Sequence, residues 1–83
     1  MAHQIIVPKR VQKELNGFPE HKRQKIIAIF AVIAVNPYGG KKLGGERKDE
    51  WSYRVWPYRV IYKIFKKELV VLIIITGHRQ GVY

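Results

Sequence analysis

The spacing of hydrophobic residues changes from a helical period to a strand period about halfway along the chain. In the first half, Val11 and Leu15 lie four positions apart, and Ile26, Phe30 and Ile33 lie at i, i+4 and i+7, as on one face of a helix. In the second half, apolar and polar residues alternate, which is the period of a half-buried β-strand. The pattern therefore predicts two helices followed by a group of strands.

Proline and glycine mark the boundaries of the helical half. The segment "HQIIV", 3–7, is a short strand candidate that Pro8 ends. A first helix over "KRVQKELN", 9–16, has Gly17 just past its end. Pro19 begins a second helix, which the dipeptide "NP" stops. Three further residues widen the apolar stripe of this second helix: Ile27, Ala31 and Ala34. These signals predict a helical hairpin.

The strand half follows a glycine-rich stretch, "YGGKKLGGERKDE" at 38–50, which we interpret as a loop. Three strands are predicted over 50–56, 58–65 and 69–76, separated by Pro57 and by the tight connection "KKE". The last strand is continuously apolar and rich in β-branched residues. That composition predicts an interior strand that is covered on both faces.

The predicted order β-α-α-β-β-β fits a single α+β domain that spans residues 1–83. The helical hairpin must cover one face of a largely antiparallel sheet, because each amphipathic element needs an apolar partner. Alternation in the first long strand places Trp51 and Tyr53 on one face and Arg54 on the other. Arg59 falls on the polar positions of the next strand. We therefore expect Arg54 and Arg59 on the sheet face that the helices leave open.

Basic residues dominate the charge of the chain. Sixteen Lys and Arg stand against six Asp and Glu, which gives a formal net charge of +10. They are spread along the whole chain, so a folded domain with basic faces is expected rather than a basic tail. Such a charge favours a polyanionic partner: nucleic acid, a ribosome, an acidic protein or an anionic membrane. A surface that serves only solubility is the alternative.

Several classes of site are excluded by composition and spacing. The chain has no cysteine, so disulfides and thiolate zinc sites are absent. Its three histidines lack metal-motif spacing, and its "GG" pairs lack the Lys-Ser/Thr sequence of a phosphate-binding loop. The apolar runs 5–7 and 69–75 are too short for a signal peptide or a membrane span. We therefore expect a cytoplasmic protein without a metal, a cofactor or a membrane partner.

A cationic set with two proton-transfer candidates remains: Arg54, Arg59, His78, Arg79 and Tyr83. Metal-free RNA cleavage suits this set, because arginines stabilise the charge that builds on the phosphodiester, and His or Tyr exchange protons with its oxygens. Nearby cations also lower the pKa of a phenol and so make it a better base. Each residue has a structural alternative, as an exposed cation, a packed ring or a turn cap, and spacing alone does not choose between them.

Three segments, "NPYGGKKLGG", "YRVWPYRVIYKI" and "VVLIIITGHRQGVY", together resemble the RelE branch of the RelE/ParE toxin superfamily. The segment "KELNGFPEHKRQKI" resembles the helical hairpin of that family. The resemblance covers nearly the whole chain and implies a βααβββ fold and the toxin of a type II toxin–antitoxin module. RelE-like members of the superfamily cut mRNA in the ribosomal A site.

The resemblance also implies roles for individual residues. Arg59 matches the phosphate-stabilising arginine of the family, Arg79 its second essential arginine, and Tyr83 its terminal catalytic tyrosine. His78 occupies a position that varies among relatives, so acid, base and spectator roles all stay open. The expected RNA-binding residues are Arg54, Trp56, Lys41, Lys42 and Lys63.

The function implied by the resemblance is a ribosome-dependent, metal-independent endoribonuclease. Its expected partners are the ribosome, mRNA and a cognate antitoxin with acidic and apolar segments, and it would meet operator DNA only through the antitoxin complex. Two alternatives stay open. One is a ParE-like protein that poisons DNA gyrase by binding and catalyses nothing. The other is a degenerate module that only binds antitoxin and DNA.

Overall fold

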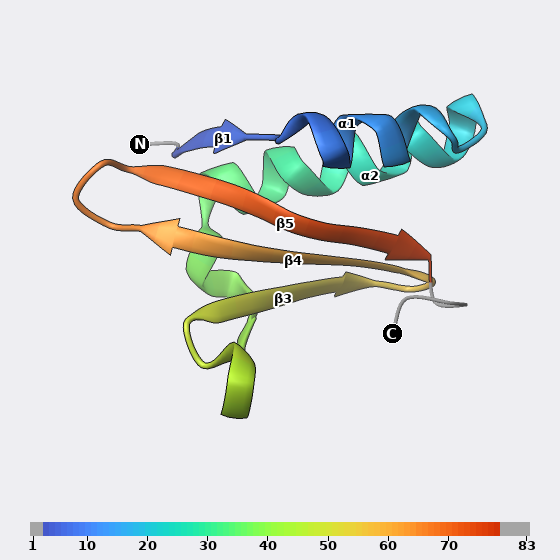
Figure 1. Cartoon of the computed structure of the whole chain (residues 1–83). Helices are drawn as coiled ribbons and strands as arrows, with labels where there is room; N and C mark the ends of the chain where they lie inside the picture. The colour runs from blue at the N-terminus through green and yellow to red at the C-terminus, as the bar shows by residue number, and fades with distance from the viewer. Residues whose placement is uncertain (1–2, 79–83) are drawn as a thin grey trace.

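The computed structural model describes residues 3–78, with side chains for residues 3–74. Its strands are β1 (Gln4–Ile6), β2 (Lys41–Lys42), β3 (Glu50–Val55), β4 (Tyr58–Phe65) and β5 (Val70–His78). The helices α1 (Lys9–Asn16) and α2 (Glu20–Val35) lie together on one side of the sheet (Figure 1). The predicted α+β fold, with a helical hairpin packed on a sheet, is confirmed.

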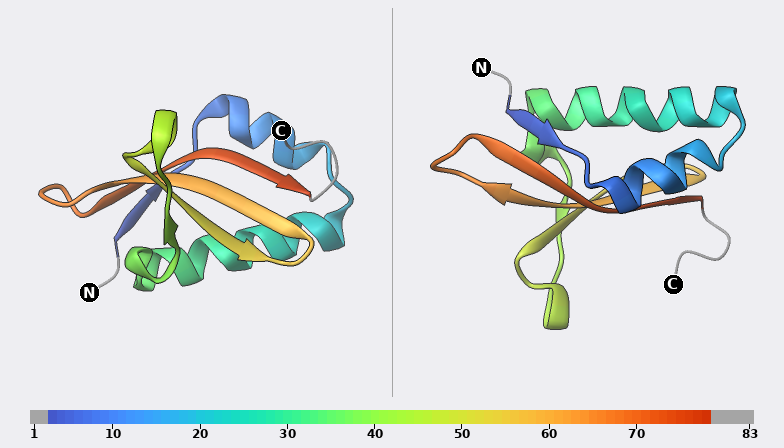
Figure 2. Two further views of the ribbon diagram at one scale, coloured as in Figure 1. Left: turned by 90° about the horizontal axis from the view of Figure 1, so that it is seen from below. Right: turned by 45° about the horizontal axis from the view of Figure 1, so that its top comes forward.

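The five strands form one sheet in the order β1-β5-β4-β3-β2. β1 pairs with β5 in parallel, with Gln4 opposite Val70, and the other three neighbouring pairs are antiparallel. The sheet is therefore largely antiparallel, as predicted, and β5 lies in its interior. The hairpin of β4 and β5 extends beyond the start of β3 (Figure 2), and this leaves the last residues of β4 without a neighbour on the β3 side.

Both helices begin after a proline, where the missing N–H would have no helical partner in any case. Pro8 precedes α1 and Pro19 precedes α2. Gly17 ends α1; its N–H donates to the carbonyl oxygen of Glu14, and the N–H of Phe18 donates to that of Leu15. The bounds predicted for the first helix agree with the structure. A short segment between the two helices then allows them to pack against the sheet as a hairpin.

The core lies between the two helices and the sheet. Its buried residues are Val11 and Leu15 from α1; Ile26, Ile29, Phe30 and Ile33 from α2; and Tyr58, Val60, Tyr62, Val71 and Ile73 from the sheet. The predicted stripe on α2 was wrong at two positions, because Ile27 is 44% exposed and Ala31 is exposed as well, and it omitted Ile29, which is 5% exposed. The reason is that positions i, i+3, i+4 and i+7 share one helical face, and that face meets the sheet.

The prediction that residues 38–50 form only a loop was also wrong. Two turns of 3-10 helix, η1 (Pro37–Gly39) and η2 (Gly45–Arg47), flank the short strand β2. β2 pairs with the start of β3, with Lys41 opposite Ser52. The pairing is only two residues long, so it leaves little period-two signal in the sequence. Figure 1 shows η2 on the side of the sheet opposite the helices.

The last strand is interior but is not covered on both faces by helices, which corrects the prediction. Leu72 is only half-buried, while Val71 and Ile73 are fully buried against the helices. The register between β4 and β5 shifts at Ile61/Tyr62, which leaves an extra residue on β5. The Arg10 guanidinium of α1 donates to the carbonyl oxygen of Ile74 at 2.8 Å. This contact attaches α1 to the middle of β5, at the irregularity.

Candidate functional site

Two arginines lie directly opposite each other on the open face of the sheet. The register of β3 and β4 pairs Arg54 with Arg59 across the two-residue turn between the strands. Tyr53 and Val60, the next residues toward the sheet centre, pack on the helical side, so alternation directs Arg54 and Arg59 to the other side. The register therefore brings two cationic residues to the same place on this face.

The end of β5 comes to the same row of the sheet. Its backbone pairs Gly77 with Arg59 and His78 with Tyr58. The predicted proton-transfer residue His78 is therefore the last residue of β5, beside the start of β4, but its side chain lies outside the described part of the chain. The two further catalytic candidates, Arg79 and Tyr83, lie outside the described residues altogether.

Three shallow hollows surround the arginine pair. The first, of 470 Å³, is lined by Lys41 and Arg54 together with the glycines that precede Lys41. The second, of 170 Å³, lies between the arginines and the turn of Trp56, whose side chain is 69% exposed. The third, of 420 Å³, lies between Arg59 and the η2 segment. Arg59 borders the second and third hollows, so cations line the site along its length.

The η2 segment contributes residues that sequence reasoning did not select. Leu43, Glu46 and Arg47 line the hollow beside Arg59, above the buried side chain of Ile61. The Arg47 guanidinium donates to the Glu50 carboxylate at 2.5 Å, which fixes η2 to the start of β3. No periodicity runs through this segment, so nothing in the sequence pointed to its position over the sheet.

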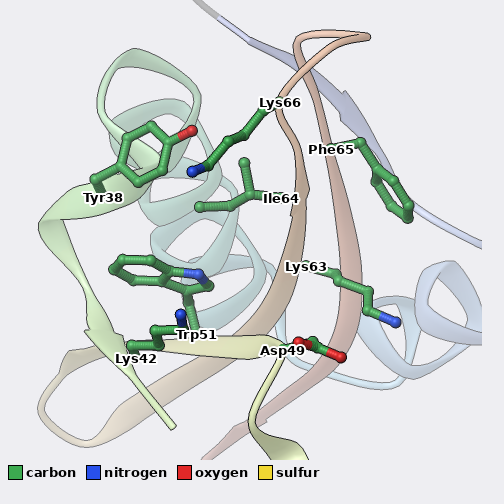
Figure 3. Close-up of a pocket in the computed structure, with 8 residues that line it drawn as sticks. All are labelled: Tyr38, Lys42, Asp49, Trp51, Lys63, Ile64, Phe65 and Lys66. Carbon is green, nitrogen blue, oxygen red and sulfur yellow. The ribbon is translucent and has the colours of Figure 1, made fainter.

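The structure divides the predicted RNA-binding residues into two groups. Lys41 and Trp56 join Arg54 around the arginine pair. Lys42 and Lys63 instead line a separate hollow of 540 Å³ at the far end of β4 (Figure 3). A shift of one position between Lys41 and Lys42 thus sends the two lysines to different parts of the surface, because successive side chains of a strand point to opposite faces.

A buried tyrosine fixes the segment that carries Lys41. The Tyr62 hydroxyl, on β4, donates to the carbonyl oxygen of Pro37 at 2.6 Å. Burial raises the pKa of Tyr62 to about 12, against a smaller lowering by a hydrogen bond from the Gly40 backbone. A Cβ on Gly40 would lie 2.5 Å from the Tyr62 hydroxyl, so only glycine fits there. Tyr62 therefore acts as an anchor for the chain beside Arg54.

Among residues 3–78, no three His, Cys, Asp or Glu side chains come close enough together to hold a metal ion. Within the same range, no helix is long and apolar enough to cross a membrane. The cations that line the three hollows are Lys41, Arg47, Arg54 and Arg59, and guanidinium and ammonium groups bind phosphate through charge-assisted hydrogen bonds.

Comparison with known proteins assigns the family. A family model described as the ParE toxin of the type II toxin–antitoxin system parDE matches residues 5–83. No curated protein matches the sequence. The fold is similar to that of the toxin–antitoxin complex RelBE2 from Mycobacterium tuberculosis, with a TM-score of 0.89 and 22% identity over 95% of this chain and 100% of that chain.

Two further solved structures share the fold. The archaeal RelE–RelB complex from Pyrococcus horikoshii is 24% identical over 98% of this chain and 99% of that chain, with a TM-score of 0.77. The isolated E. coli RelE toxin is 19% identical over 95% of this chain and 86% of that chain, also with a TM-score of 0.77. At these identities the likeness concerns the fold alone. With the family model matching nearly its whole length, the chain belongs to the ParE toxin family of the RelE/ParE superfamily and is the toxin of a type II toxin–antitoxin module.

Proposed function

We propose that this toxin is a RelE-type endoribonuclease that cleaves mRNA in the ribosomal A site without a metal ion. The observation that carries the proposal is the cross-strand pair of Arg54 and Arg59 on the open face of the sheet. β5 ends in the same row, with Gly77 opposite Arg59 and His78 opposite Tyr58. A pair of guanidinium groups is suited to a phosphodiester that gains charge during cleavage.

The proposed reaction is attack of a ribose 2′-hydroxyl on its own 3′-phosphodiester. The 2′-oxygen loses its proton and forms a bond to phosphorus, the bond to the 5′-oxygen breaks, and that oxygen takes up a proton as it leaves. Arg59 would hold the non-bridging oxygens, with Arg54 beside it. Tyr83 would serve as the base, Arg79 would stabilise the charge of the transition state, and His78 is the candidate acid. Trp56 and Lys41 would hold the neighbouring nucleotides.

The second candidate function is inhibition of DNA gyrase by binding, without catalysis. It is favoured by one observation: the matching family model bears the name of the ParE toxin. The cationic pair on the open face is the feature that makes us prefer the nuclease. A gyrase inhibitor needs a surface that fits a protein, and it has no requirement for two arginines aimed at one anion.

A bacterial translation extract distinguishes the two functions. We expect the purified toxin to stop translation and to leave mRNA ends that map to the ribosomal A site. Intact mRNA together with loss of gyrase supercoiling activity would contradict the nuclease and support the gyrase inhibitor. Absence of both effects, in protein that folds and binds its antitoxin, would indicate the degenerate module. The nuclease would act in the cytoplasm, where ribosomes are.

We further infer that the antitoxin combines acidic with apolar segments. The net charge of +10 favours a negatively charged partner. An apolar hollow of 340 Å³ between α2 and β3, lined by Ile29, Val32, Val55 and Trp56 among others, offers a place for apolar side chains. Contact of the toxin with operator DNA is proposed only through the antitoxin complex. Binding at Trp56 would cover one end of the arginine site.

A further inference from the structure

A second cationic hollow lies at the end of β4 opposite to Arg59. It has a volume of 540 Å³ and forms at the start of β3, where the β4–β5 hairpin extends past that strand. A strand rise of roughly 3.3 Å per residue puts Lys66, just past the end of β4, about 23 Å from Arg59. The side chains that matter here come from η1, β2, β3 and β4 and from the turns beside them: Tyr38, Lys42, Asp49, Trp51, Lys63 and Lys66.

One wall of this hollow is aromatic. The ring centroids of Tyr38 and Trp51 are 5.6 Å apart, with their planes at 82°. Tyr38 is 43% exposed, so part of its ring faces solvent. In Figure 3, Lys66 extends toward the Tyr38 ring, and its ammonium group lies 6.0 Å from the ring centroid. A flat ring with a cation beside it matches the two parts of a nucleotide, because the base stacks on the ring and the phosphate pairs with the cation.

The aromatic wall is held in place before any ligand binds. Tyr38 directly follows Pro37, whose carbonyl oxygen accepts the buried hydrogen bond of Tyr62. The β2–β3 register places Lys42 opposite Trp51. On its other side, Tyr38 contacts the ring of His3, with centroids 6.3 Å apart. Since these groups are already ordered, a ligand would lose little free energy in arranging them.

The charge of the hollow selects the class of ligand. Lys42, Lys63 and Lys66 line it with one carboxylate, that of Asp49. Lys63 points to the other side of β4 from Tyr38 (Figure 3), toward the open face that carries Arg59. The hollow therefore joins the helical side of the sheet, with its aromatic wall, to the cationic open face. A single-stranded nucleic acid matches both surfaces, because its bases suit the aromatic wall and its phosphates suit the cations.

We propose that this hollow binds one base and the adjoining phosphates of the single-stranded RNA that the arginine pair engages. The proposal rests on the proposed function, since it takes RNA as the ligand of the open face. The RNA reaches two contact regions about 23 Å apart, judged from the strand rise. The far contact, built by Tyr38, Lys42 and Lys66, positions the strand but takes no part in bond breaking.

The first test measures binding of a fluorescent RNA oligonucleotide with 2′-O-methyl groups, which prevent its cleavage, by fluorescence anisotropy. We expect the double variant Lys42→Ala/Lys66→Ala to bind at least about tenfold more weakly than the wild type, within the range of one stacked base and its phosphate contacts. The matched control is Lys9→Ala/Lys13→Ala, which removes the same charge from exposed positions on α1. Equal weakening by the two double variants would overturn the proposal.

The second test separates stacking from charge. The affinity of the wild type is measured for the RNA and for an abasic ribose-phosphate chain of equal length. The ratio of the two affinities gives the preference for bases, and the same ratio is measured for Tyr38→Leu. We expect Tyr38→Leu to reduce that preference by about tenfold, with unfolding curves confirming that the variant is folded. If Tyr38→Leu keeps the full preference for RNA over the abasic chain, the proposal is overturned. It is also overturned if an acidic peptide displaces RNA from the wild type but does not displace it from Lys42→Ala/Lys66→Ala.

Failure of the far contact and failure of the proposed nuclease function give different results. If wild-type toxin leaves mRNA intact in the translation extract while RNA binding still depends on Lys42 and Lys66, the nuclease function fails and the far contact stands. If mRNA is cleaved while the lysine variants bind like their control, the far contact fails and the nuclease function stands.

Discussion

At the scale of single residues, the arginine pair and Tyr62 have opposite environments. Arg54 and Arg59 lie on the open face, where Arg54 is exposed and Arg59 is half-buried. Tyr62 lies on the other face of β4 and is fully buried. Substitution of the arginines should therefore change the chemistry while leaving the fold intact, and substitution of Tyr62 should do the reverse.

The first prediction concerns the arginines. Arg59→Ala and Arg79→Ala should each fold like the wild type and lose about 2–4 kcal/mol of transition-state stabilisation, comparable to the loss of an oxyanion donor. Single-turnover cleavage on programmed ribosomes measures the rate, and urea unfolding measures stability. Arg23→Ala on α2 is the control, because it removes a guanidinium group from the helical layer. Cleavage at the wild-type rate by both site variants would show that the assignment is wrong.

The second prediction concerns Tyr83. Tyr83→Phe removes one oxygen and little volume, so antitoxin and ribosome binding should be retained. Cleavage should be at least about 100-fold slower, the low end for loss of a general acid or base. The same single-turnover assay measures this, with sedimentation on ribosomes as the check on binding. A normal rate in the Phe variant would move the proposed proton transfer to His78.

The third prediction concerns pH. Because burial raises the pKa of Tyr62 from 10.0 to about 12, the unfolded phenol ionises first as the pH rises. The stabilising contribution of the neutral phenol is complete below pH 10 and is lost between pH 10 and about 12, by roughly 2–3 kcal/mol. Urea unfolding over this range should show a steeper loss of stability in the wild type than in Tyr62→Phe. Equal slopes would contradict the assigned environment.

At the scale of elements, the short β2 segment depends on contacts from distant strands. Gly40 approaches both the Tyr62 hydroxyl of β4 and the Ser52 carbonyl of β3. These contacts hold Lys41 beside Arg54 on one side and Tyr38 in the far hollow on the other. A change at this one backbone position should therefore disturb both regions.

The fourth prediction compares two glycines of this segment. In Gly40→Ala the new Cβ would lie 2.5 Å from the Tyr62 hydroxyl and 2.7 Å from the Ser52 carbonyl oxygen. We expect a loss of about 1–3 kcal/mol in the free energy of unfolding, as for overpacked sites. Gly44→Ala is the matched control, since its new Cβ would meet no heavy atom within 4 Å apart from its chain neighbours. Urea unfolding measures both, and equal stability of the two variants would refute the close approach.

At the scale of the whole molecule, charge and exposed apolar surface point to a partner. The chain carries +10, and several large apolar side chains are exposed on α2 and around the β3–β4 turn, among them Val35, Val55 and Trp56. Three of the exposed side chains, Val32, Val55 and Trp56, line one hollow between α2 and β3, and exposed apolar surface that gathers in one place marks an interaction site. In a type II module, the antitoxin is the protein expected to cover it.

The fifth prediction is that co-expression of the cognate antitoxin restores growth to cells that produce the toxin. The two proteins should co-purify, and Val32→Lys/Val55→Lys should weaken the complex by placing charges in the apolar hollow between α2 and β3. Affinity is measured by titration calorimetry, with Lys13→Glu on the exposed side of α1 as the control for a change of charge. A toxin that is harmless alone and purifies without a partner would contradict the prediction.

Much of the candidate site followed from local pattern. Arg54 and Arg59 were placed on one face because strand alternation is local and only two residues separate β3 from β4. Lys42 and Lys63 were grouped with them on charge alone, and the structure puts these lysines around another hollow. The η2 residues beside Arg59 were not found, because their position depends on how the loop folds back over the sheet.

Local sequence pattern was sufficient to predict the order and type of the main elements. Periodicity, Pro8, Pro19 and Gly17 act within a few residues, so the bounds of α1 and β4 followed from neighbours along the chain. Only the tertiary structure decided the parallel pairing of β1 with β5, the strand order, the presence of β2 and the choice of Ile29 over Ile27 for the core. The physical reason is that these features depend on contacts between residues far apart in sequence. Hydrophobic burial selects those contacts, and because it is non-directional, the local sequence does not show which distant residues will meet.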